Sequence, residues 1–207
     1  MNGAGMNSLS DKKMRVLFIS SRPIYPIKGG DQIRTVQQLE LLTERFDVDV
    51  LFLQDSKQNN SVKDYNDRIK DEFIFHVPTW KHYLYTLRFL YNSLPMQVNY
   101  YYDKGVSGWI SRNLHNYDAV FCNNIRTAEK KKKSKGIVKY LDFVDAISMN
   151  YDKARKKAGI IKKIIYTIDY KRCRKYEQAC LDAFDSCAVI SDIDNAYITQ
   201  WKEEYIQ

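Results

Sequence analysis

Short apolar runs alternate along the chain with segments whose apolar residues have helical spacing, and this alternation predicts strands and helices in turn. The predicted strands are Arg15–Ser20, Asp47–Leu53, Phe73–Val77, Tyr117–Cys122, Gly136–Phe143 and Ser186–Ile190. The predicted helices are Gln32–Glu44, Trp80–Tyr91, Lys104–Asn113, Ile160–Ala183 and a last one from Asp192, with a loop and a short helix within Gln54–Lys70. Strands separated by helices pair in parallel through right-handed crossovers. The pattern therefore predicts an α/β fold, a Rossmann-like parallel sheet with helices on both faces.

This pattern indicates one domain, residues 14–207, preceded by a polar segment, residues 1–13, that we expect to be a flexible tail. The chain has 207 residues, of which 44% are apolar, and that is enough to build a hydrophobic core. It contains no internal repeat and no linker rich in Pro, Gly or Ser.

The first predicted strand is followed by a loop with two prolines and a glycine pair, and then by a helix. Pro23 and Pro26 favour an extended loop, because each fixes its own φ and restricts the residue before it. Gly29 and Gly30 permit a sharp turn where a Cβ would clash, and Asp31 is expected to cap the helix. Such a loop is how an α/β sheet builds a site for an anionic or polyhydroxyl ligand. An ordinary tight turn is the alternative.

Several classes of site and protein are disfavoured by motifs that the sequence lacks. There is no G-x-G-x-x-G and no G-x-x-x-x-G-K-[ST], so a nicotinamide enzyme or a P-loop protein has little support. No run of 18 apolar residues occurs, so we expect no membrane span. The four cysteines form no C-x-x-C pair and no ligand cluster with the histidines, so we expect reduced thiols and no metal site.

The net charge of +8 is unevenly distributed. Residues 126–175 contain 17 basic and 5 acidic residues, an excess of 12, so the remainder of the chain is acidic. Such an asymmetry indicates an anionic partner for one part of the fold. A basic nucleic-acid-binding domain is one alternative. The sequence has no recognised nucleic-acid module, however, and its tyrosines are not interleaved with the basic tract, so we expect no nucleic acid partner.

Four segments, taken in order, resemble one enzyme family. They are the Pro-rich loop with Gly29-Gly30 and then Arg34, Ser93–Val98 followed by tyrosines, the D-x-x-D-x-x-S pattern of Asp142–Ser148, and Tyr176-Glu177 to Phe184-Asp185 followed by Ala188–Asp192. Together they resemble the N-terminal half of retaining GT-B glycosyltransferases of the group 1, or family 4, type. The similarity is greatest to sugar transferases of bacterial surface-polysaccharide clusters, and it extends from about Met14 to Trp201.

The resemblance implies a GT-B half-domain and a sugar transferase of polysaccharide biosynthesis. Such an enzyme moves a sugar from a nucleotide-sugar, which is a co-substrate, to a glycan or lipid-linked acceptor. It uses no metal and no other cofactor. In these enzymes a C-terminal domain with a Glu-x7-Glu signature binds the nucleotide-sugar, and the sequence does not contain that domain. We therefore expect the chain to be the acceptor-side half and to be inactive alone.

The expected binding residues for acceptor or phosphate are Gly29, Gly30, Asp31, Arg34, Asn123, Asn124, Arg126, Asp142 and Asp145. The resemblance implies that the glycine loop approaches a phosphate with bare backbone N–H groups. Arg34 can pair with a phosphate or a carboxylate through two parallel hydrogen bonds. The two asparagines can bind sugar hydroxyls or cap a helix, and the two aspartates can bind a ligand or support the loop. No catalytic residue is assigned. Glu177 is expected to face water or a lysine, and Ser191 to cap the last helix.

Basic and apolar residues are mixed at helical spacing within Lys153–Tyr166. Ile160, Ile161, Ile164 and Ile165 share one face, and we expect Lys156, Lys157, Lys162 and Lys163 around it to face an anionic membrane. The alternative is that the isoleucines pack onto the sheet. The expected location is cytoplasmic, with peripheral attachment to the inner face of the plasma membrane. A non-catalytic sugar-binding or interaction module is the alternative to the transferase.

Overall fold

Six parallel strands form a single sheet in the computed structural model, which describes residues 13–55, 61–130 and 136–204. The strand order is β3-β2-β1-β4-β5-β6, and every pairing is parallel. The strands are β1 (Arg15–Ser20), β2 (Asp47–Gln54), β3 (Glu72–His76), β4 (Ala119–Asn123), β5 (Val138–Asp142) and β6 (Ser186–Ala188). This architecture confirms the predicted Rossmann-like fold. The predicted tail lies outside the described residues, apart from Lys13.

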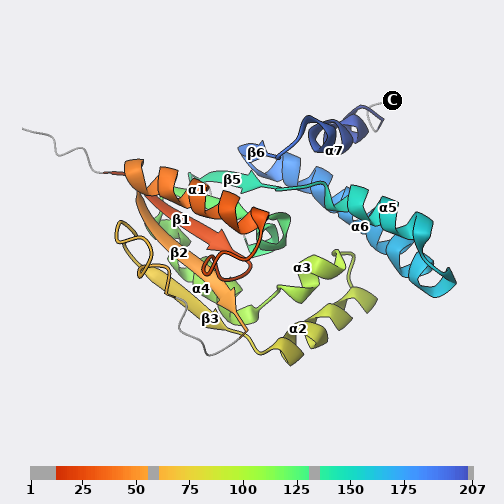
Figure 1. Ribbon diagram of the computed structural model, residues 1–207, viewed down its shortest axis with the longest axis horizontal. Helices are drawn as coiled ribbons and strands as arrows, with labels where there is room; N and C mark the ends of the chain where they lie inside the picture. Colours follow the sequence, from red (N-terminus) through yellow and green to blue (C-terminus); the bar gives the residue numbers. More distant parts are fainter. Residues whose placement is uncertain (1–12, 56–60, 131–135, 205–207) are drawn as a thin grey trace, which may run out of the picture.

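The strands are connected by helices, as Figure 1 shows. The α-helices are α1 (Gly30–Arg45), α2 (Thr79–Thr86), α3 (Met96–Tyr100), α4 (Lys104–Asn113), α5 (Ile147–Lys157), α6 (Ile160–Ala183) and α7 (Asp192–Glu204). Short 3-10 segments are η1 (Leu87–Leu90), η2 (Leu114–Asn116) and η3 (Ile125–Lys130). The sequence pattern did not predict α3 or α5. Residues 61–71 contain turns and no helix, so the predicted short helix is absent from the described part of Gln54–Lys70.

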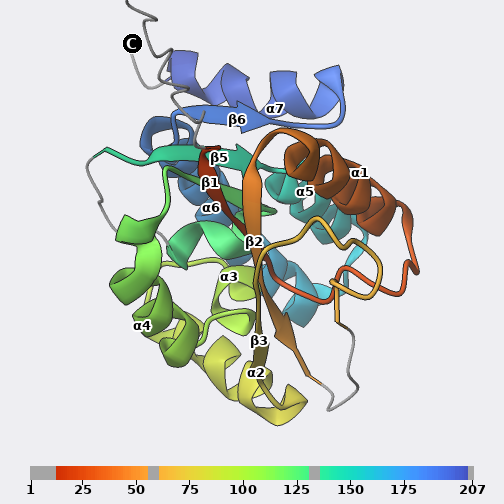
Figure 2. The same ribbon diagram turned by 90° about the vertical axis from the view of Figure 1, so that its left-hand side faces the viewer.

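Helices cover both faces of the sheet, as predicted (Figure 2). Side chains of successive strand residues point to opposite faces, and β1 therefore contributes to two separate clusters. Leu17 packs in a cluster with Ile110 of α4 and Cys173 of α6. Phe18, on the other face, packs in a cluster with Leu39 of α1. Since β1 is buried on both faces, it lies at the centre of the domain. Because β1 is held in place on both faces, the starting point of the loop that follows it is also held in place.

Two packed helices, α5 and α6, extend beyond the end of the sheet (Figure 1). The helical spacing noted within Lys153–Tyr166 is interrupted, because Gly159 stands between the two helices in an extended conformation, with φ −64° and ψ 165°. The chain reverses there, and the ring of Tyr151 on α5 meets the ring of Tyr166 on α6 edge to face. The predicted helix Ile160–Ala183 is confirmed, and the basic residues before Gly159 belong to a separate helix, α5.

The isoleucines at the start of α6 do not pack onto the sheet, so this alternative is wrong. Ile160 and Ile161 are 83% and 76% exposed, and Ile164 is more than half exposed. The four lysines named for this region, Lys156, Lys157, Lys162 and Lys163, are also exposed. Apolar and basic side chains therefore share one solvent-facing surface at the tip of α5 and α6.

The cysteines are reduced, as the sequence predicted. None of the four is part of a disulfide, and Cys122, Cys173 and Cys180 are buried. Burial, together with the negative charges of Asp169 and Glu177, raises the pKa of the Cys173 thiol. A buried thiol with a raised pKa has little thiolate character and packs as a small apolar side chain.

Candidate functional site

Three polar residues end neighbouring strands at the same level of the sheet. Ser20 of β1 pairs with Asn123 of β4, and Asn123 pairs with Asp142 of β5. The strand order reverses between β1 and β4, and ligands of open α/β sheets bind outside the carboxyl ends of the strands at this point. The loop after β1, the start of α1 and the loops after β4 and β5 all meet here, so the structure brings the predicted site residues together at one edge.

The glycine pair begins α1, but not for the reason expected from the sequence. Gly29 is the N-cap in an extended conformation, and neither Gly29 nor Gly30 has a positive φ. A Cβ built on Gly30 contacts nothing within 4 Å, so the expected steric need for this glycine is absent. The backbone N–H groups of Gln32 and Ile33 donate to the Gly29 carbonyl, at 3.1 and 3.2 Å, so the glycine pair forms the first turn of the helix.

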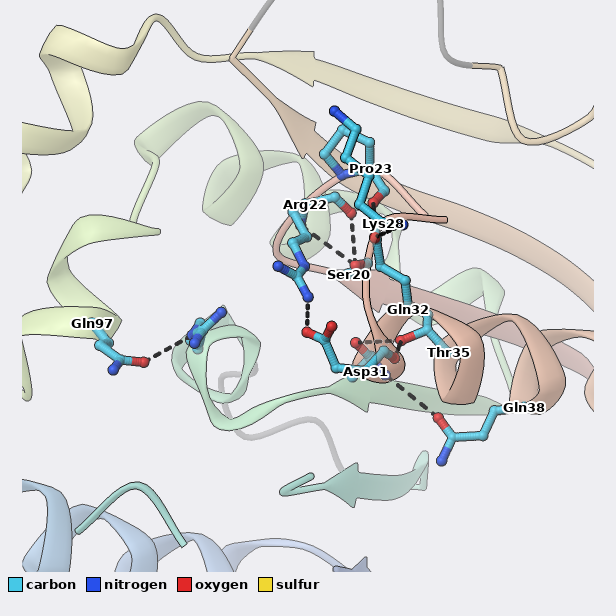
Figure 3. A network of polar contacts seen from close by, with 11 residues as sticks. Ser20, Arg22, Pro23, Lys28, Asp31, Gln32, Thr35, Gln38 and Gln97 are labelled. Atoms are coloured by element: carbon cyan, nitrogen blue, oxygen red, sulfur yellow. Dashed lines mark hydrogen bonds and ion pairs between the residues drawn. The ribbon is translucent and has the colours of Figure 1, made fainter. Parts of the chain in front are cut away.

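Asp31 is not the helix cap that was predicted. It lies in the first turn of α1, and no side chain caps this helix. Its carboxylate instead forms an ion pair with Arg22, from the loop after β1 (Figure 3). Gln32 fastens the same loop, because its amide oxygen accepts from Lys28 N at 2.6 Å and its amide nitrogen donates to the Pro23 carbonyl at 3.1 Å.

Two arginines, Arg22 and Arg126, line the same hollow at this edge of the sheet. Burial and the positive charge of Arg126 lower the pKa of Arg22. Arg126 Nε donates to Gln97 Oε1 of α3 at 2.9 Å. The sequence analysis missed Arg22, although an arginine directly after the Ser20-Ser21 end of the first strand is a signal that could have identified it.

The Arg34 side chain is hydrogen-bonded to another residue of the protein, Asp142, instead of being available to a ligand. Its Nε and Nη2 donate to the two carboxylate oxygens of Asp142, at 2.8 and 3.2 Å. Gln38 Nε2 and the backbone N–H of Val144 also donate to Asp142, which is fully buried. Arg34 therefore pairs with a carboxylate in two-pronged fashion, one of the two partners expected for it, and Asp142 has no oxygen left for a ligand.

The two asparagines at the end of β4, Asn123 within the strand and Asn124 after it, have different roles. Asn123 is buried, and its side chain contacts Thr35 and Gln38 of α1 at 3.4 Å each. Asn124 adopts a positive φ of 74°, which asparagine tolerates better than most residues. Its side-chain oxygen accepts from the backbone N–H of Arg126 at 3.2 Å. The sharp turn at Asn124 thus directs η3, and with it Arg126, toward the cleft.

Asp145 is half-buried beside the cleft. Burial raises the pKa of its carboxyl, while the Asn150 side chain, which donates at 2.6 Å, and the charge of Arg126 oppose this rise.

Asp194 accepts from the backbone N–H of Ala146 at 3.0 Å. The side chain of Ser191 accepts from Asp194 N at 3.1 Å, so Ser191 caps α7 as predicted.

Glu177 does not face water or a lysine, so this expectation is wrong. It is buried within α6, and it accepts hydrogen bonds from Ser148 N at 2.9 Å and from Ser148 Oγ at 2.5 Å. Burial raises the pKa of Glu177 to about 7, and the two bonds from Ser148 oppose that rise. Two of the segments that carry the family resemblance therefore meet in one buried contact.

A small polar hollow lies between the loop after β1, the start of α1 and the loops after β4 and β5. Its lining residues include Ser20, Ser21, Arg22, Asp31, Gln32, Thr35, Asn123, Asn124, Arg126 and Val144. Its volume is about 10 Å³, room for one water molecule. The side chains of Arg22 and Asp31 point toward each other at this edge (Figure 3), so an anion bound there has to compete with Asp31.

The described part of the chain contains no group of three or more His, Cys, Asp or Glu side chains arranged to hold a metal ion. Within the same residues, the helices are too short or too polar to cross a membrane. Comparison with known protein families finds no match, and a search among curated proteins finds no similar sequence.

Proposed function

We propose that this chain is the acceptor-side half of a GT-B glycosyltransferase that transfers a sugar from a nucleotide-sugar to a phosphate-bearing acceptor. The observation that carries the proposal is the pair of guanidinium groups, Arg22 and Arg126, beside the start of α1 at the carboxyl edge of the sheet. Two like charges held close together gain stability when an anion lies between them. Helix N-termini favour the same kind of ligand.

The hollow holds only one water molecule, so the proposed phosphate or diphosphate lies over its rim, where its charge suits the two guanidinium groups better than a neutral sugar does. Arg22 is held by one partly exposed ion pair with Asp31, and Arg126 by one neutral amide, Gln97. Both contacts are weaker than the two charge-assisted bonds that a phosphate can offer to each guanidinium. Asn124, in the same hollow, supplies an amide for a neighbouring hydroxyl. These residues would bind and orient the acceptor, and the nucleotide-sugar would bind to a second domain.

The tip of α5 and α6 is the proposed membrane contact. Its exposed isoleucines can enter the interfacial region of a bilayer while Lys157, Lys162 and Lys163 meet anionic headgroups. Lys156 contributes less charge, because its Nζ is paired with Asp152 at 2.6 Å. Peripheral attachment at the cytoplasmic face would bring a lipid-linked acceptor to the cleft.

The direct test is thermal stabilisation of the chain by a lipid-diphosphate sugar, compared with the same lipid lacking the diphosphate. We expect the diphosphate to raise the melting temperature and Arg126→Ala to abolish this effect. Equal stabilisation by both lipids would contradict the proposal. Binding of a sugar without its phosphate would favour the sugar-binding module, and salt-sensitive binding of oligonucleotides that pyrophosphate cannot displace would favour the nucleic-acid domain.

A further inference from the structure

A second and larger hollow adjoins the polar one. It is a groove of about 260 Å³ between α2, α3, η3 and α5. Its walls carry Thr86, Met96, Tyr100, Tyr101 and Tyr151, together with Gln97 and Arg126. Arg126 lines both hollows, so a single guanidinium separates the polar hollow from the groove. A ligand held by Arg126 can therefore extend into the groove.

Most polar groups on the groove wall are already hydrogen-bonded within the protein. Thr86 Oγ1 donates to the His82 carbonyl at 2.9 Å, and the Tyr151 hydroxyl bonds to Asp169 and Gln97. Gln97 Oε1 accepts from Arg126. A sugar ring needs several directed hydrogen bonds to replace those it makes with water. A hydrocarbon needs none, and it gains free energy from every apolar surface that it covers.

The aromatic side chains of the groove wall pack against neighbouring rings. The Tyr100 ring stacks on His82 with centroids 4.7 Å apart and meets the Tyr101 ring edge to face at 4.9 Å. The Arg126 guanidinium lies 5.2 Å from the centre of the Tyr101 ring. Such a wall is already formed before any ligand arrives, so little conformational entropy is lost when an apolar chain binds.

The apolar surface continues outward from the groove over α2 and η1. Tyr83, which meets the Tyr100 ring edge to face at 5.9 Å, is two-thirds exposed. The other large apolar side chains exposed on this surface are Trp80, Leu84, Leu87, Leu90 and Tyr91. Exposed apolar side chains gathered within 12 residues mark an interaction surface more often than a random feature of a soluble domain.

We propose that the groove binds the hydrocarbon chain of an amphiphilic phosphate or diphosphate ester whose head group lies at Arg126. This proposal rests on the function proposed above, and it decides between the two acceptor classes, a free glycan and a lipid-linked one, in favour of the latter. The hydrocarbon chain of the ligand lies along Tyr101, Tyr100 and Met96, and it leaves the groove across the exposed surface of α2 and η1. This exposed surface of α2 and η1 then faces the membrane that contains the lipid ligand.

The experiment is a binding series with one head group and a growing apolar chain. Inorganic pyrophosphate, isopentenyl diphosphate, geranyl diphosphate and farnesyl diphosphate are titrated by calorimetry below the concentrations at which they form micelles. We expect affinity to rise at least tenfold from isopentenyl to farnesyl diphosphate. Met96→Trp, which fills the groove, should return farnesyl diphosphate to the affinity of isopentenyl diphosphate and leave pyrophosphate unchanged. Met96→Leu is the matched control that keeps the groove apolar and open.

The outcomes separate the two proposals. Equal affinity along the series, or a rise that Met96→Trp does not affect, would overturn the groove assignment and leave the anion site intact. Failure of all four compounds to bind would overturn the function proposed above and the groove with it. If glucose 1-phosphate binds more tightly than isopentenyl diphosphate, and Met96→Trp removes only this advantage, the groove holds a sugar ring instead. Circular dichroism spectra of both variants establish that they are folded.

Discussion

Arg34 and Asp142 lie 108 positions apart in the sequence, and their side chains form a two-pronged ion pair beneath the cleft. The pair joins α1 to the end of β5 and is shielded from water on the Asp142 side. The hydrogen bonds and the charge of Asp142 raise the pKa of Arg34, so the guanidinium stays charged under all ordinary conditions. The contact therefore holds the floor of the site in place.

Arg34→Ala should destabilise the domain and leave the anion-binding groups in place. Removing one partner of a buried ion pair costs about 3 kcal/mol or more, because the other charge remains buried. We expect a loss of about 3 kcal/mol in the free energy of unfolding, measured by urea denaturation, with pyrophosphate affinity changed less than threefold. A large loss of affinity in a variant of unchanged stability would instead make Arg34 a ligand-binding residue.

Arg22→Ala and Arg126→Ala should weaken pyrophosphate binding and leave the free energy of unfolding nearly unchanged. A hydrogen bond to a charged group contributes about 1.5–3 kcal/mol, which corresponds to a loss of about tenfold or more in pyrophosphate affinity. Both side chains are partly exposed, so the free energy of unfolding should change little. Arg112→Ala, an exposed arginine in the last turn of α4, is the matched control and should bind as the unchanged protein does.

Asp31→Asn should tighten anion binding. The Asp31 carboxylate occupies Arg22 and adds a negative charge to the hollow, so a bound phosphate must displace it. Removing this charge should raise pyrophosphate affinity several-fold in a calorimetric titration at low salt. A carboxylate in the first turn of a helix contributes about 0.3–1 kcal/mol, and the variant should be less stable by that amount. Weaker binding would show that Asp31 itself contacts the ligand.

Glu177 should make stability depend on pH. Burial raises its pKa to about 7, whereas an unfolded glutamate titrates near 4.3. The folded state binds this proton more tightly, so the stability of the domain falls as pH rises through the window between these two values. The expected loss is about 1.4 kcal/mol for each unit by which the pKa is raised.

The measurement is urea denaturation of the unchanged protein and of Glu177→Gln at several pH values between about 4 and 8. Because glutamine cannot ionise, the difference in stability between the two proteins should move in favour of the variant as pH rises. A pH-independent difference would show that Glu177 titrates alike in both states. The comparison cancels the contributions of carboxyls that do not interact with Glu177, whereas the charge of Asp145, which helps to raise the pKa of Glu177, is part of the difference that is measured.

The tip of α5 and α6 should bind anionic vesicles in a salt-sensitive way. Each lysine near an anionic surface contributes about 1 kcal/mol, so replacing Lys157, Lys162 and Lys163 by alanine should abolish co-sedimentation with phosphatidylserine vesicles. Lys104 and Arg112, exposed on α4, provide the control substitution. Equal binding of the unchanged protein to neutral vesicles would contradict an electrostatic attachment.

The sequence pattern was sufficient to predict the sheet and the edge at which the site lies. Asn123 and Asp142 each end an apolar run, and parallel strands bring their carboxyl ends together. The roles of individual residues were harder to predict. Residue types show that Arg34 can pair with a carboxylate, but only the fold decides that the carboxylate is Asp142.

Other errors have the same origin. Glu177 has the polarity of a surface residue, and its burial depends on Ser148, which lies 29 positions earlier and belongs to another helix. The periodicity around Ile160 shows that apolar residues share a face, but it contains no information on whether another element covers that face. Such long-range relationships depend on tertiary packing, which the local pattern does not encode.

The exposed isoleucines of α6 have one more consequence. Ile160 and Ile161 are nearly as accessible to water in the folded domain as in an extended chain, so their identity contributes little to the difference in free energy between the two states. Substitutions at these two positions can therefore change the proposed binding of the tip to a membrane without changing the free energy of unfolding. The proposed membrane binding of the tip and the stability of the fold are thus separable by substitution at these two positions, and selection can adjust either one alone.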